Sequence, residues 1–120
     1  MKKVALFDYL INNADRKLSH FLPDKDGRLW LVDHGLTFNA VPKLRTILWD
    51  FSGQPVPDEL LVDVRALQDK LKPDKPLRQS LGQLLDESEI KALESRINAI
   101  LEKPAFVHPG PHRSVPWPWY

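Results

Sequence analysis

The chain has 120 residues, of which 42% are hydrophobic and 28% charged, and its formal net charge is +1 at pH 7. This length fits one domain, and the mixed charges give no basic surface for nucleic acid or anionic membranes. The absence of cysteine excludes disulfide scaffolds, thiolate metal sites and cysteine nucleophiles. No apolar run approaches the roughly 18 residues of a membrane span, and Asp8 interrupts an N-terminal run already too short for a signal peptide. We therefore expect a cytoplasmic protein without a transmembrane segment.

The first third of the chain predicts a helix and then a β-hairpin. Apolar residues recur at the spacing of one helix face over residues 3–12, namely Val4, Phe7, Leu10 and Ile11. This helix should stop at Asn12-Asn13, since asparagine tolerates turn conformations. Two short apolar runs then flank the Asp-Gly turn signal of "DKDG", which predicts a hairpin over about residues 20–33.

The rest of the chain predicts more helices and an extended tail. Helical spacing marks residues 42–51, 58–71, 76–85 and 86–101. Asp86 and Glu89 form a capping-box pattern at the start of the last helix. Five of the 11 prolines fall in residues 104–118, so the tail cannot be helical.

Large aromatic residues end this proline-rich tail. We expect Trp117, Trp119 and Tyr120 to pack on the domain body, because aromatics of this size usually lie in cores or interfaces. His108 and His112 are spaced by prolines and do not suggest a metal site.

Polar side chains are concentrated in the stretch "LINNADRKLSHFL", which contains neither glycine nor proline. A second polar motif, Asp33-His34-Gly35, follows the predicted hairpin, so the hairpin should bring Asp15 and Asp33 towards each other. Phosphoryl transfer from a nucleotide needs one carboxylate that orients and deprotonates the acceptor hydroxyl, and ligands that hold Mg²⁺ on the phosphates. Protein kinases take these groups from a catalytic loop and from the Asp of a following D-F-G motif.

Four motifs, "NNADRK", "LVDHGLTF", "KLRTILWDF" and "PWPW", resemble bacterial proteins described as phosphatidylinositol 3- and 4-kinase-like. Phosphoinositide kinases carry D-R-H-x-x-N in the catalytic loop, and "DRKLSH" lies on it residue for residue. By this resemblance Asp15 is the catalytic base and Asp33 the main Mg²⁺ ligand. His20 takes the place of the second metal-binding Asn, Lys17 that of a histidine, and Arg16 stabilises the loop or the phosphates.

The resemblance implies a mainly α fold with one small β-hairpin (α+β), the C-terminal lobe of a kinase-like fold. Residues 1–103 would form this lobe, with the catalytic loop at 12–20 and the metal motif at 33–35, and residues 104–120 a tail packed on it. The expected cofactors are ATP with Mg²⁺ or Mn²⁺, and an imidazole ligand at His20 favours Mn²⁺. The glycine-rich loop and strand lysine of an N-terminal lobe have no counterpart in the sequence. We therefore expect weak nucleotide binding, and an N-terminal-lobe chain or self-association as partner, but no nucleic acid.

Other interpretations stay open. The chain could be a truncated or degenerate kinase-like module that only binds a partner. It could also be a metal-dependent phosphohydrolase that uses Asp15, His20, Asp33 and His34. His20 could equally be a hydrogen-bonded structural residue. The motifs leave the phosphoryl acceptor open among lipids, proteins and small molecules.

Overall fold

Helix α1, Lys2–Leu10, opens the chain in the computed structural model, which describes residues 1–110 and 113–120. His112 lies outside the described residues. The predicted helix over 3–12 is confirmed, and it ends where Asn12 takes a positive φ of 53°. The buried Asn12 amide then donates to the carbonyls of Asn39 and Val41 at 2.7 and 2.8 Å. The end of α1 is therefore fixed to the loop around residue 40.

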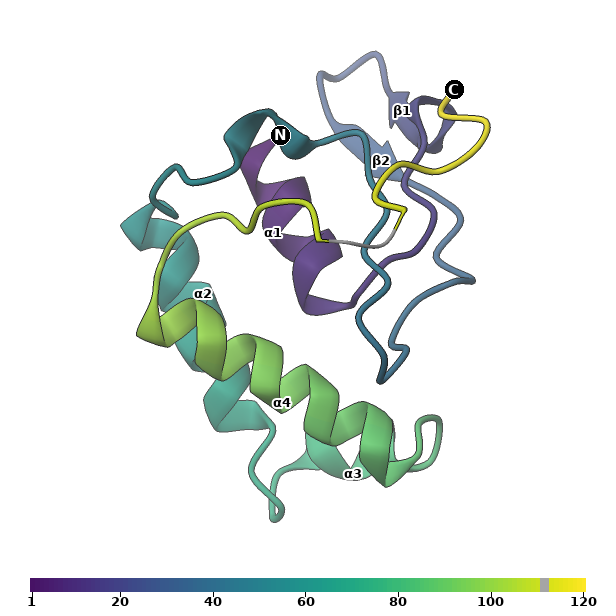
Figure 1. The fold of residues 1–120 in the computed structure, drawn as a ribbon. Coiled ribbons are helices and arrows are strands. Elements are labelled where there is room, and N and C mark those ends of the chain that lie inside the picture. The colour runs from purple at the N-terminus through teal and green to yellow at the C-terminus, as the bar shows by residue number, and fades with distance from the viewer. Residues whose placement is uncertain (111–112) are drawn as a thin grey trace.

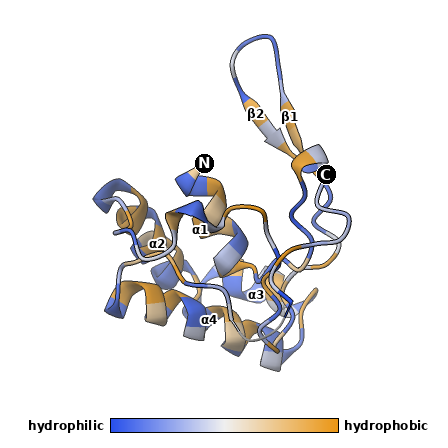
Figure 2. Cartoon of the chain, turned by 45° about the horizontal axis from the view of Figure 1, so that its top comes forward, coloured by the Kyte–Doolittle hydropathy of each residue, from blue (hydrophilic) through white to orange (hydrophobic). Residues whose placement is uncertain are grey.

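The predicted hairpin is confirmed as strand β1, Phe21–Pro23, paired antiparallel with strand β2, Leu29–Leu31. Gly27 supplies the positive φ of 79° that the Asp-Gly turn signal requires. The hairpin projects away from the helices, and the end of the chain lies beside its base (Figures 1 and 2). The fold class is therefore α+β, with helices and one small hairpin.

Asp24 organises the turn of the hairpin. Its carboxylate accepts hydrogen bonds from the backbone N–H groups of Asp26 and Arg28 and from Trp30 Nε1, each at 2.9 Å. These bonds, that of Trp30 foremost, hold the pKa of the Asp24 carboxyl below its usual value. Asp24 therefore stabilises the turn of a hairpin whose two strands are only three residues long each.

Three further helices follow in the second half of the chain: α2 (Asp58–Lys70), α3 (Pro76–Gly82) and α4 (Glu87–Glu102). Helix α4 lies against both α2 and α1 (Figure 1), and buried residues of these three helices form one cluster. The core includes Leu6, Leu10, Leu60, Leu61, Val64, Leu93, Ile97 and Ile100. Asp86 and Glu89 make the predicted capping box at the start of α4.

The helix predicted over residues 42–51 is wrong. Only the 3₁₀ turn Trp49–Phe51 is present there. Distant segments bind the backbone that a helix would use: Lys43 N donates to Asn12 Oδ1, and Arg45 N donates to the Asn13 carbonyl, both at 2.9 Å. Tertiary hydrogen bonds therefore override the helical pattern.

The described residues of the tail, 104–110 and 113–120, form no helix, as predicted, and their backbone is attached to the body. Phe106 is buried, and the Trp119 carbonyl accepts a hydrogen bond from Leu18 N at 2.9 Å. The prediction that the terminal aromatics pack on the domain is wrong. Trp117, Trp119 and Tyr120 are 76%, 49% and 64% exposed. Backbone hydrogen bonds, and not burial of these rings, therefore attach this segment to the body.

Within the described residues, none of the helices combines the length and the apolar character needed to cross a membrane.

Candidate functional site

The polar loop after α1 runs beside the segment that leaves β2. Backbone hydrogen bonds join the two at both ends, from Ala14 N to the Leu36 carbonyl at 2.8 Å and from Val32 N to the His20 carbonyl at 3.1 Å. The predicted catalytic loop and the predicted metal motif therefore lie side by side, as the hairpin connection requires.

Arg16 anchors this loop to α1. Its guanidinium donates from Nε to Asp8 Oδ2 and from Nη2 to Asp8 Oδ1, both at 2.9 Å. Both side chains are 0% exposed. Two parallel hydrogen bonds to one carboxylate fix orientation as well as distance. Arg16 is therefore held rigidly inside the domain.

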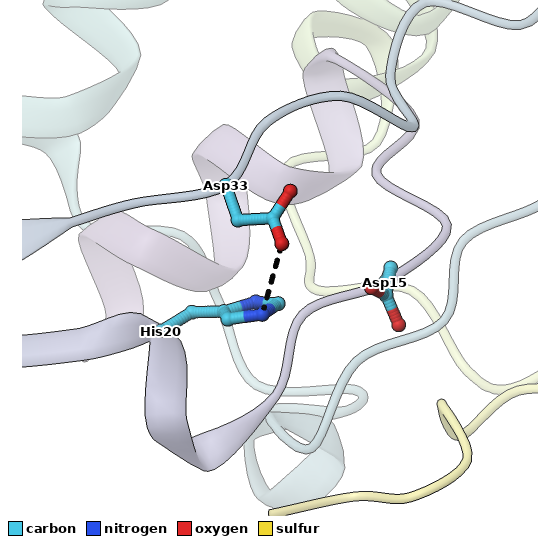
Figure 3. A group of neighbouring side chains, drawn as sticks. All are labelled: Asp15, His20 and Asp33. Carbon is cyan, nitrogen blue, oxygen red and sulfur yellow. Dashed lines mark ion pairs between the residues drawn. The ribbon is translucent and has the colours of Figure 1, made fainter.

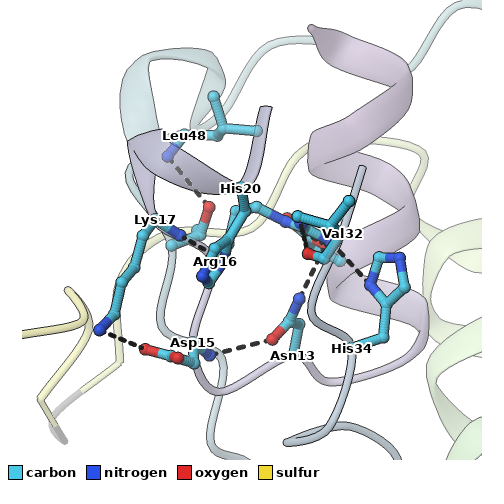
Figure 4. A network of polar contacts seen from close by, with 10 residues as sticks. Asn13, Asp15, Arg16, Lys17, His20, Val32, His34 and Leu48 are labelled. Atoms are coloured by element: carbon cyan, nitrogen blue, oxygen red, sulfur yellow. Dashed lines mark hydrogen bonds and ion pairs between the residues drawn. The ribbon is translucent and has the colours of Figure 1, made fainter. Parts of the chain in front are cut away.

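The same guanidinium also donates hydrogen bonds to the residues on both sides of Asp33. Nη1 donates to the Val32 carbonyl at 3.3 Å, and Nη2 donates to His34 Nδ1 at 3.2 Å (Figure 4). Because Arg16 directly follows Asp15, these contacts link the loop at Asp15 to the residues on both sides of Asp33. Of the two roles that the resemblance gave Arg16, these contacts are those of loop stabilisation, and the buried guanidinium is not placed to bind a phosphate.

Asp15, His20 and Asp33 come together at the surface of this region (Figure 3). One ligand atom from each of the three residues lies within 4.8 Å of the others. The expectation that the hairpin brings Asp15 and Asp33 together is confirmed. Asp33 has a positive φ of 63°, an uncommon conformation that Asp and Asn adopt more readily than most residues. Such backbone strain is frequent at functional sites.

The surroundings of the two carboxylates differ. The Asp33 side chain is 62% exposed, whereas that of Asp15 is 24% exposed. Asp15 is fixed from the backbone side, because its N–H donates to Asn13 Oδ1 at 2.9 Å. Lys17 Nζ lies 3.7 Å from Asp15 Oδ1, so the lysine that replaces the loop histidine lies beside the expected base. Asp15 is thus the more enclosed carboxylate and has a cation next to it.

His20 is the most enclosed of the three, and its side chain is 9% exposed. Its Nδ1 accepts a hydrogen bond from Lys17 N at 3.2 Å. Its Nε2 lies 3.5 Å from Asp33 Oδ2. The ring therefore spans the gap between the backbone of the loop and the metal motif.

His34, the remaining candidate, lies outside the cluster. The hydrolase interpretation needs it as a ligand, but its Nδ1 accepts a hydrogen bond from Arg16 Nη2, and its ring packs edge-on against Phe7 with ring centroids 5.9 Å apart. The observed cluster therefore offers two carboxylates and one imidazole.

Asp8 is a site residue that the sequence did not identify. Its position four residues after Val4, on a helix face of otherwise apolar residues, was the available signal. An acid at such a position needs a buried partner, since an unpaired buried charge is very unfavourable. The partner, Arg16, could not be found by local spacing alone.

Comparison with known proteins gives one relative. Protein Rv2133c of Mycobacterium tuberculosis is 42% identical over 118 residues, which are 98% of this chain and 42% of that protein. The chain therefore spans less than half the length of the curated relative that it matches. No protein-family model matches the chain. No solved structure matches it. The resemblance to phosphoinositide kinases accordingly stays a prediction.

The donor set fits a hard divalent cation. Mg²⁺ is usually bound by one or two carboxylates together with water and substrate phosphates, at 2.0–2.1 Å from each oxygen. Carboxylates of Asp15 and Asp33 whose ligand atoms lie within 4.8 Å of each other can both serve one hydrated ion, one of them through water. The Asp33 carboxylate itself is open to solvent.

Proposed function

We propose that this chain is a kinase-like phosphotransferase domain that binds a divalent cation together with ATP at Asp15 and Asp33. The observation that carries the proposal is the approach of Asp15, His20 and Asp33 to within 4.8 Å across the base of the hairpin. The roles follow the resemblance to phosphoinositide kinases, with Asp33 as metal ligand and Asp15 as base.

The arrangement of the other residues supports these roles. Arg16 contacts the residues on both sides of Asp33, so the segment that carries the proposed metal ligand is held in place. Positioning and charge stabilisation are the main contributions of a protein to phosphoryl transfer. The bound cation would neutralise charge on the phosphates. In this proposal Asp15, whose backbone is fixed by Asn13 and whose side chain is less exposed than that of Asp33, would accept the proton of an acceptor hydroxyl.

The first test is whether the chain binds ATP in a metal-dependent way. We expect Mg²⁺–ATP to shift the amide NMR signals of residues 13–20 and 32–36, with a Kd on the order of 1 mM, or about −4 kcal/mol. This is the strength of a few exposed ionic contacts. Mg²⁺–AMP should bind more weakly, because the cation is held on the β- and γ-phosphates. Binding that does not depend on Mg²⁺, or shifts confined to other residues, would contradict the proposal.

A second candidate function is partner binding, and the exposed apolar side chains favour it. Leu18, Leu22 and Trp30 of the hairpin region are 52%, 48% and 55% exposed, and Trp117 and Trp119 are exposed as well. The Trp119–Leu18 hydrogen bond places the two groups side by side. Contiguous exposed apolar surface often marks an interaction site. Self-association of the chain without any metal–nucleotide binding would favour this function, and release of phosphate from a generic ester would favour the hydrolase.

A further inference from the structure

His20 stabilises the local backbone through its Nδ1 atom, and this role limits what its Nε2 atom can bind. It is the third residue of the 3₁₀ turn that begins after Lys17, and this turn runs from Leu18 to His20. Its Nδ1 accepts the Lys17 backbone N–H at 3.2 Å, the contact that Glu or Gln makes in a capping box. The imidazole is therefore part of the local backbone structure.

This hydrogen bond determines the tautomer of the neutral ring. The Lys17 backbone N–H can only donate, so Nδ1 must offer its lone pair. A neutral imidazole has a single N–H, which must then be on Nε2. That nitrogen lies 3.5 Å from Asp33 Oδ2, so the proton on Nε2 is next to the carboxylate (Figure 3).

Metal ligation by Nε2 would require the opposite tautomer. A ligating histidine nearly always donates its other ring N–H to an acceptor. Here the group beside Nδ1 is itself a donor, and moving the proton to Nδ1 would bring two N–H groups together at 3.2 Å. Ligation would therefore break the cap of the 3₁₀ turn in the loop that carries Asp15.

We propose that His20 is a positioning residue that orients the Asp33 carboxylate through Nε2–H, and that the cation is bound by carboxylate oxygens alone. This role differs from the ligand role that the resemblance gives His20, and its metal aspect rests on the proposed function. Oxygen ligands suit Mg²⁺, so the imidazole-based preference for Mn²⁺ is not expected.

The tautomer can be measured without any metal. Long-range ¹H–¹⁵N NMR should show His20 with an unprotonated Nδ1 and a protonated Nε2, and this pattern should persist when Mg²⁺ is added. Asp33→Asn should shift the Nε2 signal, whereas Asp26→Asn, an exposed acid at the hairpin turn, should leave it unchanged. A protonated Nδ1, or an Nε2 signal that Asp33→Asn does not move, would overturn the inference.

Metal affinity gives the second readout. His20→Asn should lower the affinities for Mg²⁺ and for Mn²⁺ by a similar factor, roughly tenfold. A loss of this size is typical when a group that orients a metal ligand is removed. The ratio of the two affinities should stay within about twofold of the wild-type value. A selective loss of Mn²⁺ affinity would show that His20 is a ligand. His108→Asn, a change at an exposed tail histidine, is the matched control. If the wild-type chain binds neither ion, the proposed function fails, while the tautomer measurement still decides the position of the proton.

Discussion

Replacing Arg16 with Met should lower the free energy of unfolding by about 3–5 kcal/mol, the usual cost of breaking a buried ion pair. The change leaves the Asp8 carboxylate in a fully buried position without its cation. It also removes the donors to the Val32 carbonyl and to His34. Urea denaturation of the wild type and the variant, followed by circular dichroism, measures the difference.

Two controls distinguish the loss of the Asp8–Arg16 ion pair from general effects of the substitution. Lys72→Met removes an exposed cation whose partner, Asp69, is also exposed, and it should leave stability unchanged within error. The double variant Asp8→Leu/Arg16→Met should recover much of the loss, because apolar replacements of both partners leave no unpaired charge. If Arg16→Met alone lowers the free energy of unfolding by less than about 1 kcal/mol, this contradicts a buried, fully formed Asp8–Arg16 ion pair.

Replacing Asp33 with Asn should lower metal-dependent ATP affinity at least tenfold, or by about 1.4 kcal/mol or more. The change removes the negative charge of the expected metal ligand. It keeps the size of the side chain and a residue type that tolerates the positive φ of 63°. NMR titration with Mg²⁺–ATP measures the effect.

Asp26→Asn serves as the control for this change. Asp26 is exposed at the turn of the hairpin, so its loss alters the net charge equally without touching the cluster. Its affinity for Mg²⁺–ATP should match that of the wild type. Equal losses in the two variants would mean that overall charge, and not a site at Asp33, governs binding.

Local patterns predicted the elements that depend on local interactions. The Asp-Gly turn required the positive φ found at Gly27, and the capping box of Asp86 and Glu89 marked the start of α4. The apolar stripes of α2 and α4 identified most of the core. The meeting of Asp15 with Asp33 was also predictable, because a hairpin places the residues at its two ends close together.

Features that depend on distant partners were not predictable in this way. The helical pattern of residues 42–51 gave no sign that Asn12 and Asn13 bind its backbone. The pairing of Asp8 with Arg16 crosses from a helix to a loop, so helical spacing could not identify it. Apolar character alone likewise could not show that Trp117 stays exposed while the backbone of the tail is held.

A shared cation at Asp15 and Asp33 is the central claim, and anomalous diffraction tests it directly. Crystals grown with Mn²⁺ and ATP should show one ordered Mn²⁺ bound by an Asp33 oxygen, with Asp15 joined to it through one water. The phosphates should lie on the exposed side of Asp33. An ordered Mn²⁺–ATP complex held elsewhere on the chain, with Asp15 and Asp33 both free of metal, would contradict this account.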